Sequence, residues 1–122
     1  MNTITATFVQ NRTPWLLLSL GLAATIAALT LMPQASMRVG PQGVDKFYHM
    51  AAFAALIFPT ALLRPKWCLR FGCLAILYGG LIEAIQPVFG RSADMSDFWA
   101  DGLGVAMGIF LGLAARRIFF ER

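Results

Sequence analysis

Four long apolar stretches separated by short polar segments make up most of the chain. The first, over about residues 15–32, contains no charged residue, and three more follow over about 47–63, 67–88 and 97–115. As helices rising about 1.5 Å per residue, these stretches approach or exceed the roughly 30 Å thickness of a hydrocarbon layer. The pattern predicts an all-α integral membrane protein, a bundle of four transmembrane helices.

Composition supports a membrane protein over a soluble one. The chain has 122 residues, of which 58% are hydrophobic and only 13% are charged, and its mean hydropathy is +0.67. An ordinary soluble domain carries about a quarter charged residues. We therefore expect a single membrane domain over residues 1–122. The first apolar stretch is longer than the apolar part of a usual signal peptide, so we interpret it as a retained helix.

The segments between the apolar stretches contain turn and capping residues. Residues 33–44 carry two prolines and two glycines and are predicted to form a loop. Asp45 precedes the second apolar stretch and is expected to cap its helix, and Asp97 is expected to open the fourth helix.

The distribution of positive charge predicts an orientation. Seven of the ten Lys and Arg residues fall in the amino-terminal segment, the second connection and the tail, and three fall in the first and third connections. Short loops rich in Lys and Arg stay on the cytoplasmic side, so we expect both termini to be cytoplasmic. The basic residues lack the aromatic interleaving of a nucleic-acid site, and the expected partners are membrane lipids, with other integral membrane subunits as an alternative.

Polar residues at helical spacing form three pairs at the predicted outer ends of the last three helices. The pairs are Asp45 and His49, Glu83 and Gln86, and Asp97 and Asp101. Members of each pair share a helix face, and ionisable groups at membrane depth are costly unless they face protein or water. We therefore expect the pairs to converge inside the bundle. Together with two neighbouring basic residues they give the candidate binding cluster: Asp45, Lys46, His49, Glu83, Gln86, Arg91, Asp97 and Asp101.

Small residues follow along the same helix faces as these polar pairs. Gly79 lies on the third helix, and Gly104, Gly108 and Gly112 follow at four-residue spacing on the fourth. Glycines at this spacing allow helix backbones to approach closely in lipid. We expect these four positions to be helix-packing sites.

The polar cluster has three interpretations. It is either a structural ion-pair network in which Arg91 bridges carboxylates, or an outward-facing pocket in which His49 and Glu83 exchange protons or bind a polar head group. A third and weakest interpretation is a divalent metal such as Mn²⁺ or Zn²⁺ held by Asp97, Asp101, Glu83 and His49, since no ligand motif such as HExxH is present. We therefore assign no metal, cofactor or catalytic residue from the sequence.

Four short motifs occur in order along the chain. They are D-K-x-x-H at Asp45, Lys46 and His49, E-x-x-Q at Glu83 and Gln86, G-R at Gly90 and Arg91, and D-x-x-A-D-x-x-G at Asp97, Ala100, Asp101 and Gly104. This ordered set, over roughly residues 40–115, resembles the VanZ-like family. The resemblance implies a small bacterial inner-membrane protein of the cell envelope, in a family whose namesake is linked to glycopeptide-antibiotic resistance. Many relatives carry Asn where this chain has Asp101, which adds a negative charge.

The resemblance does not supply a reaction, so the function is predicted from the cluster. Our leading hypothesis is non-enzymatic recognition of a lipid-linked or peptide-like polar group. One alternative is a small accessory or assembly subunit of a larger membrane complex. Another is an enzyme acting on lipid-linked phosphates with His49 and Glu83 as acid and base, but the chain offers no strong nucleophile and no dense basic phosphate clamp.

Overall fold

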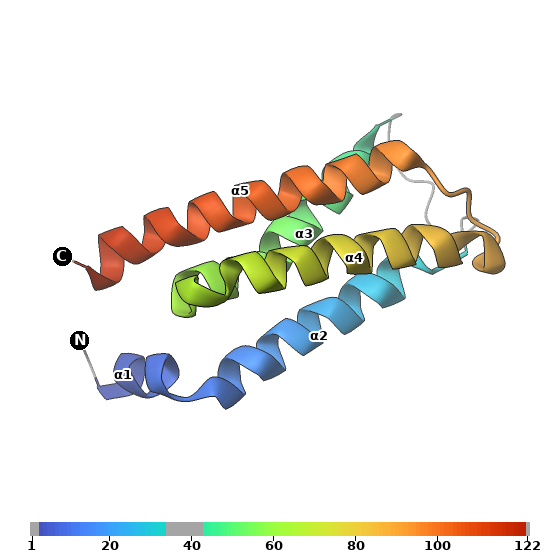
Figure 1. Ribbon diagram of the computed structural model, residues 1–122. Coiled ribbons are helices and arrows are strands. Elements are labelled where there is room, and N and C mark those ends of the chain that lie inside the picture. The colour runs from blue at the N-terminus through green and yellow to red at the C-terminus, as the bar shows by residue number, and fades with distance from the viewer. Residues whose placement is uncertain (1–2, 34–42, 122) are drawn as a thin grey trace.

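The protein is a bundle of long helices that run side by side, with both described chain ends at the same end of the bundle (Figure 1). The computed structural model describes residues 3–33 and 43–121. In chain order the elements are α1 (Thr3–Gln10), α2 (Arg12–Thr30), α3 (Val44–Leu63), the 3₁₀ helix η2 (Pro65–Trp67), α4 (Cys68–Ile85), the 3₁₀ helix η3 (Gln86–Phe89) and α5 (Met95–Phe120).

Within the described ranges, four segments are long and apolar enough to cross a membrane. They are Arg12–Thr30, Val44–Leu63, Pro65–Phe89 and Met95–Phe120. Many large apolar side chains of these segments are exposed on the outside of the bundle. Such a surface suits lipid, where a helix need not bury its apolar face against protein. The predicted all-α, four-span membrane fold is confirmed.

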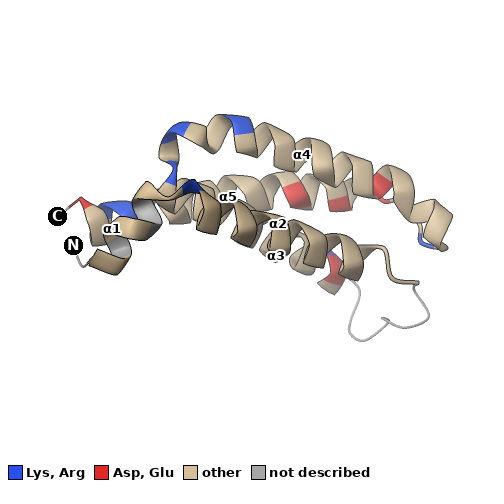
Figure 2. Ribbon diagram, turned by 90° about the horizontal axis from the view of Figure 1, so that it is seen from below, with Lys and Arg blue, Asp and Glu red and all other residues tan. Residues whose placement is uncertain are grey.

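Charged residues are unevenly distributed along the bundle axis (Figure 2). Most of the described Lys and Arg residues lie toward the end that holds the two chain ends, whereas Asp and Glu, apart from Glu121, lie toward the opposite end. Lys46 and Arg91 are the described basic residues at that opposite end. The two ends of the bundle therefore differ in charge.

Helix α3 lies at the centre of the packing. Its residues Phe53, Ile57 and Ala61 are almost completely buried. Ile26 of α2 and Val105 of α5 belong to the same apolar cluster. The core is thus built around one helix, with the others packed against its sides.

Helices α3 and α5 approach each other at glycine positions. A Cβ atom added at Gly104 would collide with the Met50 carbonyl oxygen of α3, and one at Gly108 would collide with the backbone of Ala54. At Gly112 an added Cβ would lie 2.5 Å from the Ala61 Cβ. Van der Waals contact between carbon atoms needs about 3.5–4.0 Å, so the observed approach requires these glycines.

Helix α2 is joined to the rest of the bundle by buried polar contacts. The Trp15 indole Nε1 donates a hydrogen bond of 3.0 Å to the Thr60 hydroxyl of α3, and Trp15 is only 4% exposed. The Tyr78 hydroxyl of α4 donates to the Ala23 carbonyl of α2. In an apolar environment such bonds orient a helix that dispersion forces alone would hold only weakly.

The starts of two helices differ from the prediction. Asp45 is not the N-cap of α3, because the helix begins at Val44 after Gly43, which has φ of +91°. Asp97 does not open α5 either, since that helix begins at Met95 and Asp94 is its N-cap. Both acidic residues lie instead in the first turn of their helices, where a negative charge still favours the helix dipole.

Other helix bounds differ by a few residues. The short helix α1 was not expected, α2 begins at Arg12 rather than near residue 15, and α5 continues to Phe120. Helix α4 ends at Ile85 and is extended by η3 to Phe89, near the expected end. The predicted loop over residues 33–44, with Arg38, falls largely outside the described residues, as does Arg122.

Candidate functional site

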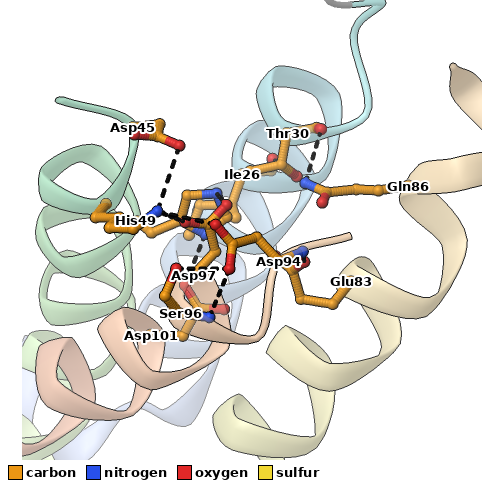
Figure 3. A network of polar contacts seen from close by, with 11 residues as sticks. Ile26, Thr30, Asp45, His49, Glu83, Gln86, Asp94, Ser96, Asp97 and Asp101 are labelled. Atoms are coloured by element: carbon orange, nitrogen blue, oxygen red, sulfur yellow. Dashed lines mark hydrogen bonds and ion pairs between the residues drawn. The ribbon is translucent and has the colours of Figure 1, made fainter. Parts of the chain in front are cut away.

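Four buried polar side chains from three helices converge near the end of the bundle opposite the two chain ends (Figure 3). His49 comes from α3, Glu83 from α4, and Asp97 and Asp101 from α5, and each is at most 8% exposed. We refer to these four residues as the buried polar cluster. Sequence spacing predicted that each of them lies on the helix face that points into the bundle, and the structure brings them together.

The imidazole of His49 is held between two carboxylates of α5. Its Nδ1 lies 2.9 Å from Asp101 Oδ1, and its Nε2 lies 3.8 Å from Asp97 Oδ2. An ionised carboxylate only accepts hydrogen bonds, so Nδ1 is the donor to Asp101. In the neutral imidazole this leaves the Nε2 lone pair facing Asp97.

Glu83 contributes one satisfied and one free oxygen. Its Oε2 accepts a hydrogen bond of 3.0 Å from the Asp94 backbone amide, in the segment that leads into α5. Its Oε1 is buried and has no hydrogen-bond partner among the described residues, and the same is true of Asp101 Oδ2. A buried acceptor without a donor is costly, so these oxygens favour a group that supplies hydrogen or positive charge.

Lys46 bridges the first turn of α3 to the start of α5. Its Nζ lies 3.0 Å from Asp94 Oδ2 and 3.2 Å from Asp97 Oδ1, and Asp45 Oδ2 is more distant at 3.9 Å. The bridging role that the ion-pair interpretation gave to Arg91 belongs to Lys46. Within the described part of the chain Arg91 forms no ion pair, and its backbone amide donates to the Gln86 carbonyl.

The remaining predicted residues lie around the cluster. Gln86 is 1% exposed, and its Nε2 donates to the Thr30 carbonyl of α2 at 3.3 Å, while its Oε1 has no partner among the described residues. Asp45 is exposed at the rim. The structure thus gathers four of the eight candidates, adds Lys46 at their edge, and places Gln86, Asp45 and Arg91 farther out.

Asp94 is a part of the site whose role the sequence analysis did not assign. Its Oδ1 accepts hydrogen bonds from the Ser96 hydroxyl (2.6 Å) and the Ser96 amide (2.9 Å). These bonds, followed by the Lys46 ammonium, lower the pKa of Asp94 from 3.8 to about 2. The signal was present in the sequence as D-x-S before an apolar run, which is an N-cap pattern.

Two further features of the cluster bear on its chemistry. His49, Glu83 and Asp97 each offer one potential ligand atom, and these three atoms lie within 4.8 Å of one another. Asp101 packs against α4 where that helix has no side chain, since a Cβ at Gly79 would lie 2.7 Å from Asp101 Oδ2. The cluster therefore combines an imidazole and carboxylates, which are groups that can accept hydrogen bonds or coordinate a cation.

Comparison with known proteins gives one result. A family model described as VanZ/LLP1 matches residues 2–117. Neither a curated protein nor a solved structure gives a significant match. The matched range includes the whole of the buried polar cluster and covers nearly the entire length, so the resemblance drawn from the ordered motifs is confirmed and the chain belongs to the VanZ/LLP1 family.

Proposed function

We propose that this multi-pass, VanZ-like cell-envelope protein binds the polar group of a lipid-linked or peptide-like molecule in its buried polar cluster, without converting it. The observation that carries the proposal is a set of buried oxygens at this end of the bundle that have no donor among the described residues. These are Glu83 Oε1 and Asp101 Oδ2 of the cluster and, beside it, Gln86 Oε1. Leaving such atoms unpaired costs about 1–3 kcal/mol each, and a ligand that donates to them recovers that cost.

The charge of the cluster narrows the ligand chemistry. Three carboxylates are buried there, and the basic groups beside them are His49 and the half-exposed Lys46. A site rich in acceptors favours amino, amide or hydroxyl groups and disfavours a bare phosphate. This argues against an enzyme that transfers or hydrolyses lipid-linked phosphates.

The orientation of the bundle is part of the proposal. The basic residues near the chain ends favour a cytoplasmic location for that end, which gives the cluster an outward-facing position in the inner membrane of a bacterium. A single cysteine at Ser92, in a chain whose Cys68 and Cys73 are replaced by alanine, should react with a membrane-impermeant maleimide in intact cells. A cysteine at Lys66 in the same background should react only after lysis. The reverse labelling pattern would contradict the orientation.

The recognition role is tested with the isosteric change Glu83→Gln and with His49→Ala. The protein is purified in mild detergent, and the lipids that accompany it are compared by mass spectrometry between wild type and variants. We expect a lipid-linked polar molecule to accompany the wild type and to be lost from both variants. Glu121→Gln is the control, because Glu121 pairs with Arg116 at the far end of the bundle.

In cells the same variants should behave like a deletion strain in susceptibility to glycopeptide antibiotics, while accumulating normally in the membrane. The proposed function would be contradicted if Glu83→Gln and His49→Ala retained the lipid profile and the antibiotic susceptibility of the wild type. Co-purification of a stoichiometric protein partner that is retained by both variants would instead favour the accessory-subunit alternative.

A further inference from the structure

We propose that the buried polar cluster binds one divalent transition-metal ion, Zn²⁺ or Mn²⁺, through His49 Nε2 and the carboxylates of Glu83 and Asp97. Asp101 acts as the positioning residue for the imidazole. The inference deepens the proposed function, because it concerns the same cluster and names the positive charge that its oxygens lack. Metal binding is nevertheless measurable without knowing the polar group that the protein recognises.

The three ligand groups are close enough to share an ion. Their ligand atoms lie within 4.8 Å of one another, and His49 Nε2 is 3.8 Å from Asp97 Oδ2. Tetrahedral ligands about 2.0–2.1 Å from a metal lie about 3.3 Å apart. Closing the His49–Asp97 pair onto an ion therefore requires a movement of about half an ångström, and a pair at the 4.8 Å limit requires about 1.5 Å.

The imidazole is already oriented for coordination. A metal-binding histidine usually donates its other ring N–H to a carboxylate, which fixes the tautomer and raises the basicity of the ligating nitrogen. His49 Nδ1 lies 2.9 Å from Asp101 Oδ1, and Asp101 is completely buried against Gly79 of α4. This arrangement leaves Nε2 directed toward Asp97 and available as a ligand.

The charge balance of the cluster calls for a cation. Glu83, Asp97 and Asp101 are three carboxylates, and Lys46, which is shared with Asp94, is the one Lys or Arg among the described residues that forms an ion pair with them. Glu83 is 8% exposed and belongs to the trio of ligand groups, and its Oε1 has no partner among the described residues. A buried charge without a compensating partner costs several kcal/mol. A divalent ion at this point supplies the compensating positive charge.

The donor set fits Zn²⁺ or Mn²⁺ better than Mg²⁺ or Ca²⁺. One imidazole is present, which suits the transition metals, whereas Mg²⁺ and Ca²⁺ are bound mainly by oxygen ligands. Three protein ligands leave at least one coordination position open. An amide or hydroxyl oxygen of the recognised molecule would complete the coordination there, which keeps the ligand classes named above and links the ion to the proposed function.

The test uses the full-length protein purified in detergent, stripped with EDTA and titrated with Zn²⁺, Mn²⁺ or Mg²⁺. Bound metal is counted by mass spectrometry, thermal unfolding is followed in parallel, and the visible absorption of added Co²⁺ reports imidazole and carboxylate ligation. We expect one equivalent of Zn²⁺ or Mn²⁺ per chain, a raised Tm and weak or no binding of Mg²⁺. His49→Ala and Glu83→Gln should each abolish stoichiometric binding. Metal-free Glu83→Gln should unfold near the wild-type temperature because the change is isosteric, whereas metal-free His49→Ala should have a lower Tm because Asp101 loses its buried partner.

Asp101→Asn separates positioning from ligation. The amide can still accept from His49 Nδ1 but carries no charge, so we expect the stoichiometry to persist with affinity weakened about 10- to 100-fold. The control is Asp45→Asn, which changes an exposed carboxylate on α3 outside the trio and should leave binding unchanged.

The inference is overturned if the wild type binds no stoichiometric metal, or if metal binding survives His49→Ala. It is also overturned if Asp45→Asn abolishes binding as completely as His49→Ala does, because that result indicates adventitious surface binding. The two proposals fail separately. A co-purifying lipid-linked molecule that is lost from Glu83→Gln without any bound metal leaves the proposed function standing alone. A bound metal without such a molecule leaves only the metal site.

Discussion

Replacing Gly104 by alanine tests the close contact between α3 and α5. An added Cβ would lie 3.0 Å from both the carbonyl carbon and the Cα of Met50, and closer still to the carbonyl oxygen. These are backbone atoms of a continuous helix, so no side-chain rotation relieves the collision. The two helices must separate, which makes Gly104→Ala a direct probe of their approach.

The size of the effect follows from the same distances. Carbon contacts need about 3.5–4.0 Å, so the helices must part by roughly half an ångström or more. Overpacking of this kind costs about 1–3 kcal/mol. The same movement acts on the buried polar cluster, because His49 precedes Met50 and Asp101 lies one turn before Gly104. Their 2.9 Å contact would approach about 3.5 Å, where a hydrogen bond is largely lost.

The stability of Gly104→Ala is measured by titrating the purified protein with SDS in mixed micelles and following tryptophan fluorescence. The matched control is Gly102→Ala in the same helix, where an added Cβ meets nothing within 4 Å. Both variants gain the same helix propensity of about 1 kcal/mol, so the difference between them isolates the collision. Equal stability of the two variants would refute the close approach of α3 and α5.

Three further predictions concern contacts around this pair of helices. Trp15→Phe should lower the free energy of unfolding by about 1 kcal/mol, measured in the same SDS titration, because it leaves the buried Thr60 hydroxyl without its donor. Lys46→Met should cost about 1 kcal/mol or less, since the ion pair is partly exposed, and the loss should shrink further in high salt. Asp94 has a pKa lowered to about 2, so the stability that its ionised form contributes is complete above about pH 4 and is lost as the pH falls through about 2. The difference in thermal unfolding between wild type and Asp94→Ala should therefore be nearly constant well above about pH 4 and should shrink to its minimum below about pH 2.

The sequence predicted the fold because lipid imposes a simple requirement. A membrane-spanning helix needs about 20 apolar residues, and the four stretches that meet this requirement became the four long helices. The same constraint made the polar positions informative. His49, Glu83, Asp97 and Asp101 stand out in apolar segments, and helical spacing alone was enough to place them on inward faces.

The sequence did not determine which polar groups would pair. Asp97 and Asp101 share one face of α5, and only the axial offset of α3 against α5 decides that Asp101 contacts His49 Nδ1. The ion-pair interpretation gave the bridging role to Arg91, whereas in the structure Lys46 pairs with the carboxylates. Arg91 follows Gly90, whose φ of +74° turns the chain, and the direction of such a turn depends on tertiary contacts that a residue pattern does not contain.

The short elements were missed for a related reason. Helix α1 has eight residues and no acidic residue in its first turn, and an isolated helix of this length is marginal. At the start of α5 the run D-M-S-D offered three residues that favour the N-cap position, Asp94, Ser96 and Asp97. Asp94 is the cap because its backbone amide also donates to Glu83 of α4, a contact between helices that propensity does not encode.

The packing of the bundle and the geometry of the cluster depend on each other. His49, Asp97 and Asp101 lie on the two helices that meet at the glycine contacts, so their relative positions depend on how closely α3 and α5 approach each other. Glu83 belongs to α4, which meets this pair through Gly79 and the Asp94 amide. Because lipid provides no hydrophobic drive between helices, a group bound by Glu83 and by the α3–α5 pair would add directly to the force that holds α4 in place. Occupancy of the cluster should therefore be coupled to the docking of α4 against the closely packed α3–α5 pair.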